Sequence, residues 1–119
     1  MTNLNQIWKC NICGNIVTIL HSGADSLVCC GQPMKLIEAK NKDEGMEKHA
    51  PVIDGKTVKI GFVPHPMEEK HYIEWVSATD RKTTERIFLK PNSKPEVEFH
   101  FNPIAVRCYC NVHGLWKNK

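Results

Sequence analysis

Three features that would indicate a membrane protein, a secreted protein or a nucleic-acid-binding protein are absent from this sequence of 119 residues. No apolar run approaches the roughly 18 residues that a membrane-spanning helix needs. Residues 1–6 contain neither a basic nor an apolar stretch, so they do not resemble a signal peptide. The lysines are scattered, and at a net charge of only +3 this counts against nucleic acid as a partner. We therefore expect a cytoplasmic protein with no membrane or nucleic-acid partner.

The sequence also has no convincing amphipathic helix and no internal repeat. After residue 50, short runs rich in β-branched and aromatic residues are separated by turn residues such as Asp54-Gly55 and Asn102-Pro103. Several short strands at this spacing predict an antiparallel β-sandwich. The expected strands are 16–20 near the start of the chain and 58–62, 72–76, 86–89, 97–101 and 104–108 in the second part.

Four of the six cysteines form two pairs near the start of the chain. Cys10 and Cys13 are separated by two residues, Cys29 and Cys30 are adjacent, and a glycine follows each pair. Four thiolates in two pairs predict a tetrahedral S4 site, which suits iron or zinc. A disulfide is the alternative, and the reduced state of cytosolic thiols counts against it. Two adjacent ligands require a kink in the peptide between them, so we expect a distorted tetrahedron.

The composition changes after this cysteine-rich segment. Residues 38–45 are polar and charged, which is typical of a linker or an exposed loop. We place the domain boundary near residue 37, with a metal module at 1–37 and the β-sandwich at 38–119. A module this short buries little core, so metal binding must supply much of its folding free energy.

Four histidines and one cysteine in the second part have surroundings that suit metal ligands. His65 lies between two prolines, which restrict its backbone to extended conformations. His71 begins an expected strand, while Cys110 and His113 follow the last one and are three residues apart. His49 lies among charged residues after the linker. Each histidine alone is more often structural or solvated, but the whole set predicts one metal site.

The remaining cysteine and histidines are expected to be ordinary. Cys108 shares its strand parity with Val106 and Ile104, which predicts a small buried apolar side chain. A role as a ligand or a disulfide partner is the alternative. His21 lies in a turn of small residues, and the alternation along the expected strand 97–101 directs the side chain of His100 outward. Both histidines are therefore expected at the surface.

Two stretches resemble a known family. The pattern Cys10-x2-Cys13-x15-Cys29-Cys30-Gly31-Gln32-Pro33-Met34 resembles the desulforedoxin-type iron module. Segments 47–49, 65–75 and 110–114 resemble the second half of desulfoferrodoxin, the two-iron class of superoxide reductase. The resemblance covers essentially the whole chain in order, and all nine ligand positions have matching residues. It implies an immunoglobulin-like fold for the β-sandwich.

The resemblance also implies two iron ions per chain. The first would be bound by four cysteines, and zinc can replace iron there. The second would be bound by four histidines as equatorial ligands and by one cysteine as the axial thiolate. The implied ligands of the first iron are Cys10, Cys13, Cys29 and Cys30. The implied ligands of the second are His49, His65, His71 and His113, with Cys110 as the axial ligand.

The implied activity is the one-electron reduction of superoxide to hydrogen peroxide, with electrons from a rubredoxin-like donor, in a homodimer. Four neutral imidazoles and one thiolate leave a ferrous centre cationic, which attracts an anion. Five ligands also leave a sixth position open for substrate. By the same resemblance, Lys48 steers superoxide by its charge and Glu47 occupies the sixth position of the ferric iron. The alternative is that both are solvated linker residues.

Three other functions fit parts of the pattern. A non-catalytic electron carrier would have a closed second site, whereas an enzyme needs an open position. A zinc-ribbon binding module would contain zinc and no iron. Superoxide dismutation would release dioxygen and need no external reductant.

Overall fold

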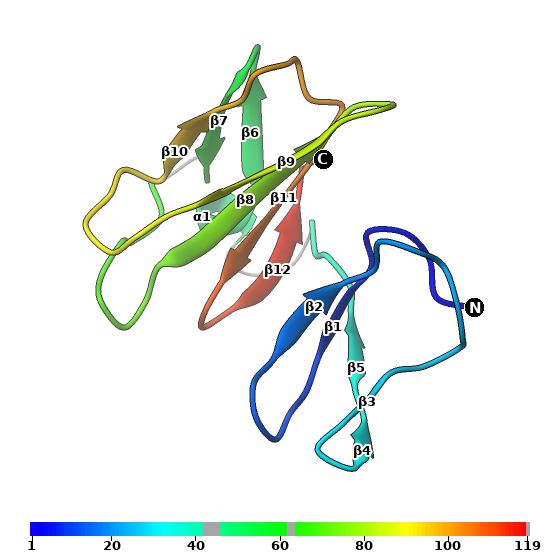
Figure 1. Ribbon diagram of the computed structural model, residues 1–119. Helices are drawn as coiled ribbons and strands as arrows, with labels where there is room; N and C mark the ends of the chain where they lie inside the picture. Colours follow the sequence, from blue (N-terminus) through cyan, green and yellow to red (C-terminus); the bar gives the residue numbers. More distant parts are fainter. Residues whose placement is uncertain (42–45, 62–63, 119) are drawn as a thin grey trace. The chain divides into compact units, whose positions relative to one another are not determined.

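The computed structural model describes residues 1–41, 46–61 and 64–118 (Figure 1). The chain divides into two compact units, Met1–Glu38 and Ala39–Lys119. Apart from one helical turn, all regular elements of the described residues are strands. None of the described helical residues forms a segment long and apolar enough to span a membrane.

The first unit contains two small antiparallel sheets. Three strands pair in the order β2-β1-β5, and β3 pairs with β4. The core cluster of the unit contains only four buried residues, Trp8, Cys10, Ile19 and Met34. The strands are β1 (Ile7–Lys9), β2 (Ile16–Thr18), β3 (Val28–Cys29), β4 (Gln32–Pro33) and β5 (Lys35–Ile37).

The second unit is an antiparallel β-sandwich, which confirms the predicted fold class. One sheet has the order β10-β7-β6 and the other β12-β11-β8-β9 (Figure 1). Every pairing in both sheets is antiparallel. The strands are β6 (Pro51–Asp54), β7 (Thr57–Ile60), β8 (Ile73–Thr79), β9 (Thr84–Phe88), β10 (Glu96–Glu98), β11 (Ala105–Cys110) and β12 (Gly114–Lys117).

Alternate residues of these strands form the core between the sheets. Val58 and Ile60 of β7 are fully buried, as the alternation predicts, while Phe62 lies outside the described residues. From the facing sheet, β8 contributes Val76 and β11 contributes Val106 to the same cluster. This core holds the ends of β7, β8 and β11 in fixed positions, and the candidate ligands lie at or near those ends.

Two apolar residues of the expected strands are exposed. Phe88 is 71% exposed and is the last residue of β9, an edge strand of its sheet. Ile104 is 61% exposed because β11 begins only at Ala105, so the strand parity does not extend to it. Cys108 is fully buried, as its parity with Val106 predicts.

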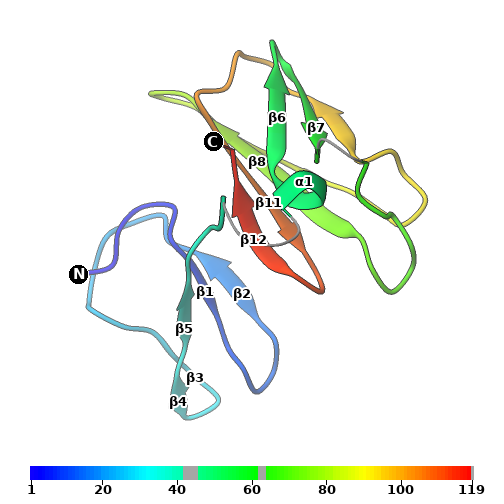
Figure 2. The same ribbon diagram turned by 180° about the vertical axis from the view of Figure 1, so that it is seen from behind.

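One helical turn, α1 (Met46–His49), precedes β6. It was not predicted, because four residues are too few to show the period of an amphipathic helix. Figure 2 shows α1 in front of β11, and the two elements are joined by a contact from Cys108 Sγ to the carbonyl oxygen of His49. The turn ends with Lys48 and His49, so both residues lie on helical backbone.

Candidate metal centres

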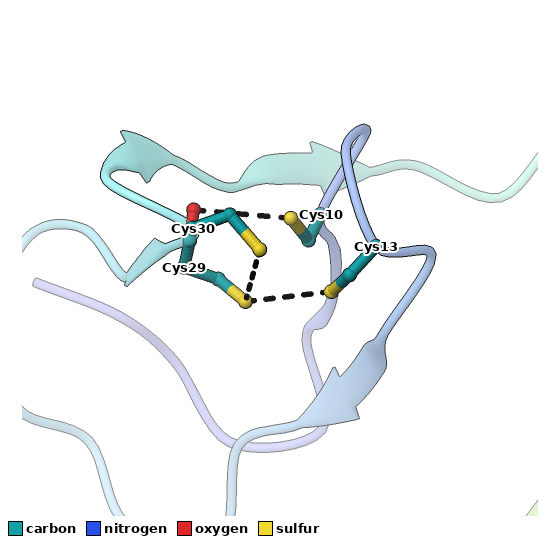
Figure 3. Close-up of side chains that lie close together, drawn as sticks. All are labelled: Cys10, Cys13, Cys29 and Cys30. Carbon is teal, nitrogen blue, oxygen red and sulfur yellow. Dashed lines mark hydrogen bonds between the residues drawn. The ribbon is translucent and has the colours of Figure 1, made fainter.

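The four cysteines of the first unit converge on one point (Figure 3). Their sulfur atoms all lie within 4.8 Å of one another. Sγ of Cys29 lies 3.6 Å from Sγ of Cys13 and 4.0 Å from Sγ of Cys30. Metal–sulfur bonds of about 2.3 Å in a tetrahedron separate neighbouring sulfurs by about 3.8 Å. The cluster therefore has the size that one tetrahedral ion requires.

The backbone at the second cysteine pair contains the predicted kink. Cys30 has a φ of 53°, in the left-handed region that is unfavourable for a residue with a Cβ. Gly31 continues in the same region with a φ of 72°. A non-glycine residue in this conformation, such as Cys30, costs on the order of 1 kcal/mol or more, and it persists where the surrounding structure requires it. Here the kink turns two adjacent sulfurs toward the same point.

Cys10 and Cys29 differ in their readiness to ionise. Backbone N–H groups of Cys13 and Ile12 stabilise the thiolate of Cys10 and lower its pKa to about 6. The hydrogen bond from Cys29 to Cys13, with a further one to Cys10, raises the pKa of Cys29 to about 12. The thiolate of Cys10 is thus favoured, and Cys29 then resists ionisation. A metal cation at the centre removes this conflict because its positive charge stabilises all four thiolates at once.

The second group of candidate ligands comes from four separate segments of the sandwich unit. His49 ends α1, while His65 and His71 lie between β7 and β8. Cys110 ends β11, and His113 lies in the turn to β12. The register between β11 and β8 shifts between Tyr109 and Cys110. Such irregularities redirect side chains near sites, and here one precedes a candidate ligand directly.

The four imidazoles form a closed ring around a common centre. Going around it, the centroids of His49 and His65 are 4.6 Å apart, and those of His65 and His71 are 4.8 Å apart. His71 and His113 are 5.0 Å apart, and His113 and His49 are 4.8 Å apart. The diagonal from His49 to His71 is 6.5 Å. Half of it, about 3.2 Å, equals a metal–nitrogen bond of ~2.1 Å plus the ~1.1 Å from nitrogen to ring centre.

The ligand atoms of three of these histidines also cluster with the thiol. Those of His49, His65, His71 and Cys110 all lie within 4.8 Å of one another. His113 is outside this tighter group, although its Nδ1 lies 3.8 Å from Sγ of Cys110. The structure therefore brings together three histidines and one cysteine, with a fourth imidazole beside them. The role of His113 as a fifth ligand stays a prediction.

Hydrogen bonding leaves metal-binding nitrogens available in the centre. Nδ1 of His65 lies 2.6 Å from the carbonyl oxygen of Pro66, and since a carbonyl only accepts, Nδ1 carries the hydrogen. The buried Nε2 atoms of His65 and His71 have no hydrogen-bond partner among the described residues. Burial lowers the pKa of His65 to about 4, so its ring is neutral at physiological pH. These properties fit a bound metal ion.

Cys110 supplies the sulfur of this centre. Its side chain is fully buried, and its Sγ accepts a hydrogen bond of 3.4 Å from the backbone N–H of His113. Burial raises the pKa of Cys110, while the N–H groups of His113 and Val112 act in the opposite direction. A metal cation stabilises the thiolate in such a place.

Asn111 forms hydrogen bonds between the turn that follows Cys110, here called the Cys110 loop, and the segment that contains His71. Its Oδ1 accepts a hydrogen bond of 2.9 Å from the N–H of Tyr72, and its Nδ2 donates one of 3.0 Å to the carbonyl of Lys70. Its own N–H donates to the carbonyl of Tyr72 at 3.2 Å. Asn111 therefore contacts the residues on both sides of His71. The sequence alone does not predict this contact, since the two segments are about forty residues apart.

Two further residues that the sequence patterns do not connect with the site touch a candidate ligand. The indole of Trp116 stacks on the ring of His49, with centroids 4.7 Å apart and an interplanar angle of 15°. Sγ of Cys108 donates a hydrogen bond of 3.2 Å to the carbonyl oxygen of His49. Burial raises the pKa of Cys108, so it remains a thiol and a donor. The contact of Cys108 with His49 spans 59 residues, which no local pattern can reveal.

The other candidate residues are placed as follows. Lys48 is at the end of α1, and the side chain of Glu47 lies outside the described residues. His21 is exposed. His100 is also exposed, and its Nδ1 lies 2.7 Å from Oε2 of Glu85. It belongs to neither of the two cysteine-containing groups.

A β-sandwich with a His/Cys centre, preceded by a four-cysteine module, defines a class of proteins with two metal centres. The two parts match known families separately. Residues 2–37 match the N-terminal domain of desulfoferrodoxin, and residues 41–119 match desulfoferrodoxin itself. The chain therefore belongs to the desulfoferrodoxin family, as its motifs predict.

Individual relatives agree with this assignment over the full length. A desulfoferrodoxin homolog of Archaeoglobus fulgidus is 51% identical over 124 residues, which cover 99% of each chain. One of Methanothermobacter thermautotrophicus is 50% identical and covers 98% of this chain and 99% of its own. Among solved structures, the superoxide reductase of Treponema pallidum superposes with a TM-score of 0.77 at 28% identity and covers 96% of each chain.

Proposed function

We propose that this protein is a superoxide reductase and that the centre formed by His49, His65, His71, His113 and Cys110 is its active site. The observation that carries this proposal is the ring of four imidazoles, whose dimensions fit one ion at the centre, with Sγ of Cys110 beside it. Family membership and the similarity to a superoxide reductase of known structure support the same activity.

The proposed reaction converts superoxide, one electron and two protons into hydrogen peroxide. A ferrous ion supplies the electron and a position where the anion binds. An iron ion held by the four cysteines would have no free position for substrate, because four thiolates complete a tetrahedron. We assign it a structural role, with electron relay as a weaker alternative, and zinc can replace iron there.

The ligands determine how the site treats an anion. Neutral imidazoles add no charge, and the low pKa of His65 keeps that ring neutral at the pH of the cell. One thiolate then lowers the charge of a divalent ion from +2 to +1, so the centre still attracts superoxide. The N–H of His113 that donates to Cys110 withdraws electron density from the sulfur and so moderates its donation to the metal.

The segment before His49 adds two proposed roles. Lys48 is adjacent to a ligand, so its positive charge can guide superoxide toward the centre. We propose that Glu47 would bind the oxidised iron while no substrate is present. This role rests on the family resemblance, because the side chain of Glu47 lies outside the described residues.

Turnover needs an external reductant, because each reaction oxidises the iron by one electron. We propose a rubredoxin-like protein as the donor, a homodimer as the assembly and the cytoplasm as the location. Metal centres that depend on reduced cysteines favour a reducing compartment.

Product stoichiometry tests the proposed function. The fully reduced protein is mixed anaerobically with a limiting amount of superoxide, and hydrogen peroxide and dioxygen are measured. A reductase forms one hydrogen peroxide per superoxide and releases no dioxygen. Dismutation would form one hydrogen peroxide and one dioxygen for every two superoxide ions. That result would contradict the proposal. An electron carrier with a closed site would react slowly, and azide would leave its spectrum unchanged.

A further inference from the structure

Cys108 and Trp116 lie directly opposite each other on neighbouring strands and touch the same histidine. They are register partners on β11 and β12, and both side chains belong to the buried core of the sandwich. The Cys108 thiol donates to the backbone carbonyl of His49, whereas the Trp116 indole stacks on its ring. One pair of side chains therefore fixes both the backbone and the imidazole of a single candidate ligand.

His49 needs such anchors more than the other ligands do. It belongs to a helix of only four residues, and an isolated helix of that length has no stability of its own. Cys110, in contrast, belongs to a six-residue strand between two others. Contacts from the sandwich core must therefore determine where the His49 ring lies.

Trp116 also contacts two other parts of the site's surroundings. Its Nε1 donates a hydrogen bond of 3.2 Å to the carbonyl oxygen of His113. The ammonium group of Lys40 lies 5.5 Å from the centroid of its ring, which is within the range of a cation–π interaction. Lys40 is itself joined to β12 by backbone hydrogen bonds to Leu115 and Lys117. The indole is thus held on several sides, and it contacts two of the four histidines, His49 and His113.

We propose that Cys108 and Trp116 form a positioning clamp, the His49 clamp, which sets the orientation of the His49 imidazole toward the metal ion. The inference rests on the proposed function in one respect, namely that His49 is an iron ligand. Both residues contact His49, and both act through it. The partners that orient metal ligands commonly change metal affinity by about 10-fold to 100-fold when they are removed.

Two pairs of variants separate this role from simple core packing. Cys108→Ala removes the donor, whereas Cys108→Ser keeps a hydroxyl that can donate to the same carbonyl. Trp116→Leu removes the stacked ring, whereas Trp116→Phe keeps an aromatic face for His49. Val106→Ala is the packing control, because Val106 is equally buried on the same strand two residues before Cys108.

The readouts are the affinity for ferrous ion, measured by competition with a chelator, and the rhombicity of the ferric electron paramagnetic resonance signal. We expect Cys108→Ala and Trp116→Leu to weaken ferrous binding at the His/Cys centre by about tenfold or more and to change the ferric signal. Cys108→Ser and Trp116→Phe should restore most of both properties. Val106→Ala should lower the melting temperature but leave the affinity and the signal as in the wild type.

The inference is wrong if Cys108→Ala and Trp116→Leu bind iron as the wild type does with an unchanged ferric signal. It is also wrong if Val106→Ala weakens binding equally, because the effect would then come from packing alone. Should Trp116→Leu fail to fold, the two Cys108 variants still decide the matter. None of these measurements uses superoxide, so they test the His49 clamp independently of the proposed function. A wild-type protein that binds iron but does not reduce superoxide would disprove the proposed function without affecting the inference about the clamp.

Discussion

The rings of His49 and His71 lie opposite each other across the sandwich site, with centroids 6.5 Å apart. Each is nearer to His65 and His113, at 4.6 to 5.0 Å. This spacing leaves room for a single ion between the rings. Four segments of the chain must keep their relative positions for the arrangement to persist, and several contacts outside the ligand set do this.

Asn111 is expected to be one of these contacts. Asn111→Ala removes both side-chain hydrogen bonds to the backbone on either side of His71. We expect ferrous affinity to fall by about tenfold, because His71 and Cys110 then lose their common support. Chelator competition measures this effect.

Asn118→Ala is a suitable control for that variant. Asn118 also accepts a backbone hydrogen bond through its side chain, from Val106 at 2.9 Å, but it lies at the other end of β11. The control should lose stability without losing iron. Equal affinities for Asn111→Ala and the wild type would show that the Cys110 loop holds its position without this side chain.

Lys48 is expected to affect the rate of encounter with superoxide. Lys48→Ile should slow the second-order reaction of the reduced protein by about tenfold at low ionic strength, because a positive charge adjacent to the ligand His49 is lost. The rate should also become less sensitive to salt, since screening then has less attraction to remove. Stopped-flow or pulse-radiolysis rates at several salt concentrations measure both effects.

Lys82→Ile is the matched control, because Lys82 is an exposed lysine in the turn between β8 and β9, and the whole of β8 separates it from His71 in the chain. It should keep both the rate and its salt dependence. An unchanged rate for Lys48→Ile at low salt would remove the steering role.

The four-cysteine centre is expected to stabilise the first unit. Cys13→Ser removes one of four sulfurs from a unit whose core cluster has only four buried residues. The thermal transition of that unit should move to a lower temperature or disappear, and the proposed dimer should weaken, because metal binding contributes much of its folding free energy. Calorimetry and analytical ultracentrifugation measure these changes. An unaltered transition in a metal-free variant would show that the small core is sufficient.

Glu85 is expected to make stability depend on pH. The backbone N–H of His100 and its ring lower the pKa of Glu85 below its ordinary value of 4.5. A lowered carboxyl pKa adds stability above pH ~4.5, and this stability is lost as the pH falls through the lowered value. The stability difference between wild type and Glu85→Gln should therefore be largest near neutrality and shrink below pH ~4. Urea unfolding at several pH values measures it, and a difference that grows toward acid pH would contradict the assignment.

Much of the metal chemistry could be predicted from the sequence because the ligands occur in recognisable local patterns. Cys10, Cys13, Cys29 and Cys30 lie in two short motifs, and the kink at Cys30 follows from the need to direct adjacent sulfurs to one ion. The strand parity also placed Cys108 in the core.

The contacts that support the ligands could not be predicted in this way. The single turn of α1 has no periodic pattern, and the pairing of Cys108 with His49 joins residues 59 positions apart. The exposure of Phe88 at the end of β9 depends on what packs over that strand end, which the strand's own sequence does not encode. Such features arise only when distant segments pack together.

The most direct test of the central claim compares Cys110→Ser with Cys13→Ser in the reaction with superoxide. Both variants replace one sulfur by oxygen, but in different centres. With iron bound in the His/Cys centre, the reduced Cys110→Ser protein should react at least ~10-fold more slowly than the wild type, a loss of about 1.4 kcal/mol in transition-state stabilisation. Cys13→Ser should react within about twofold of the wild type. A Cys110→Ser protein that keeps its iron and the full rate, or a Cys13→Ser protein that loses the rate, would contradict the account.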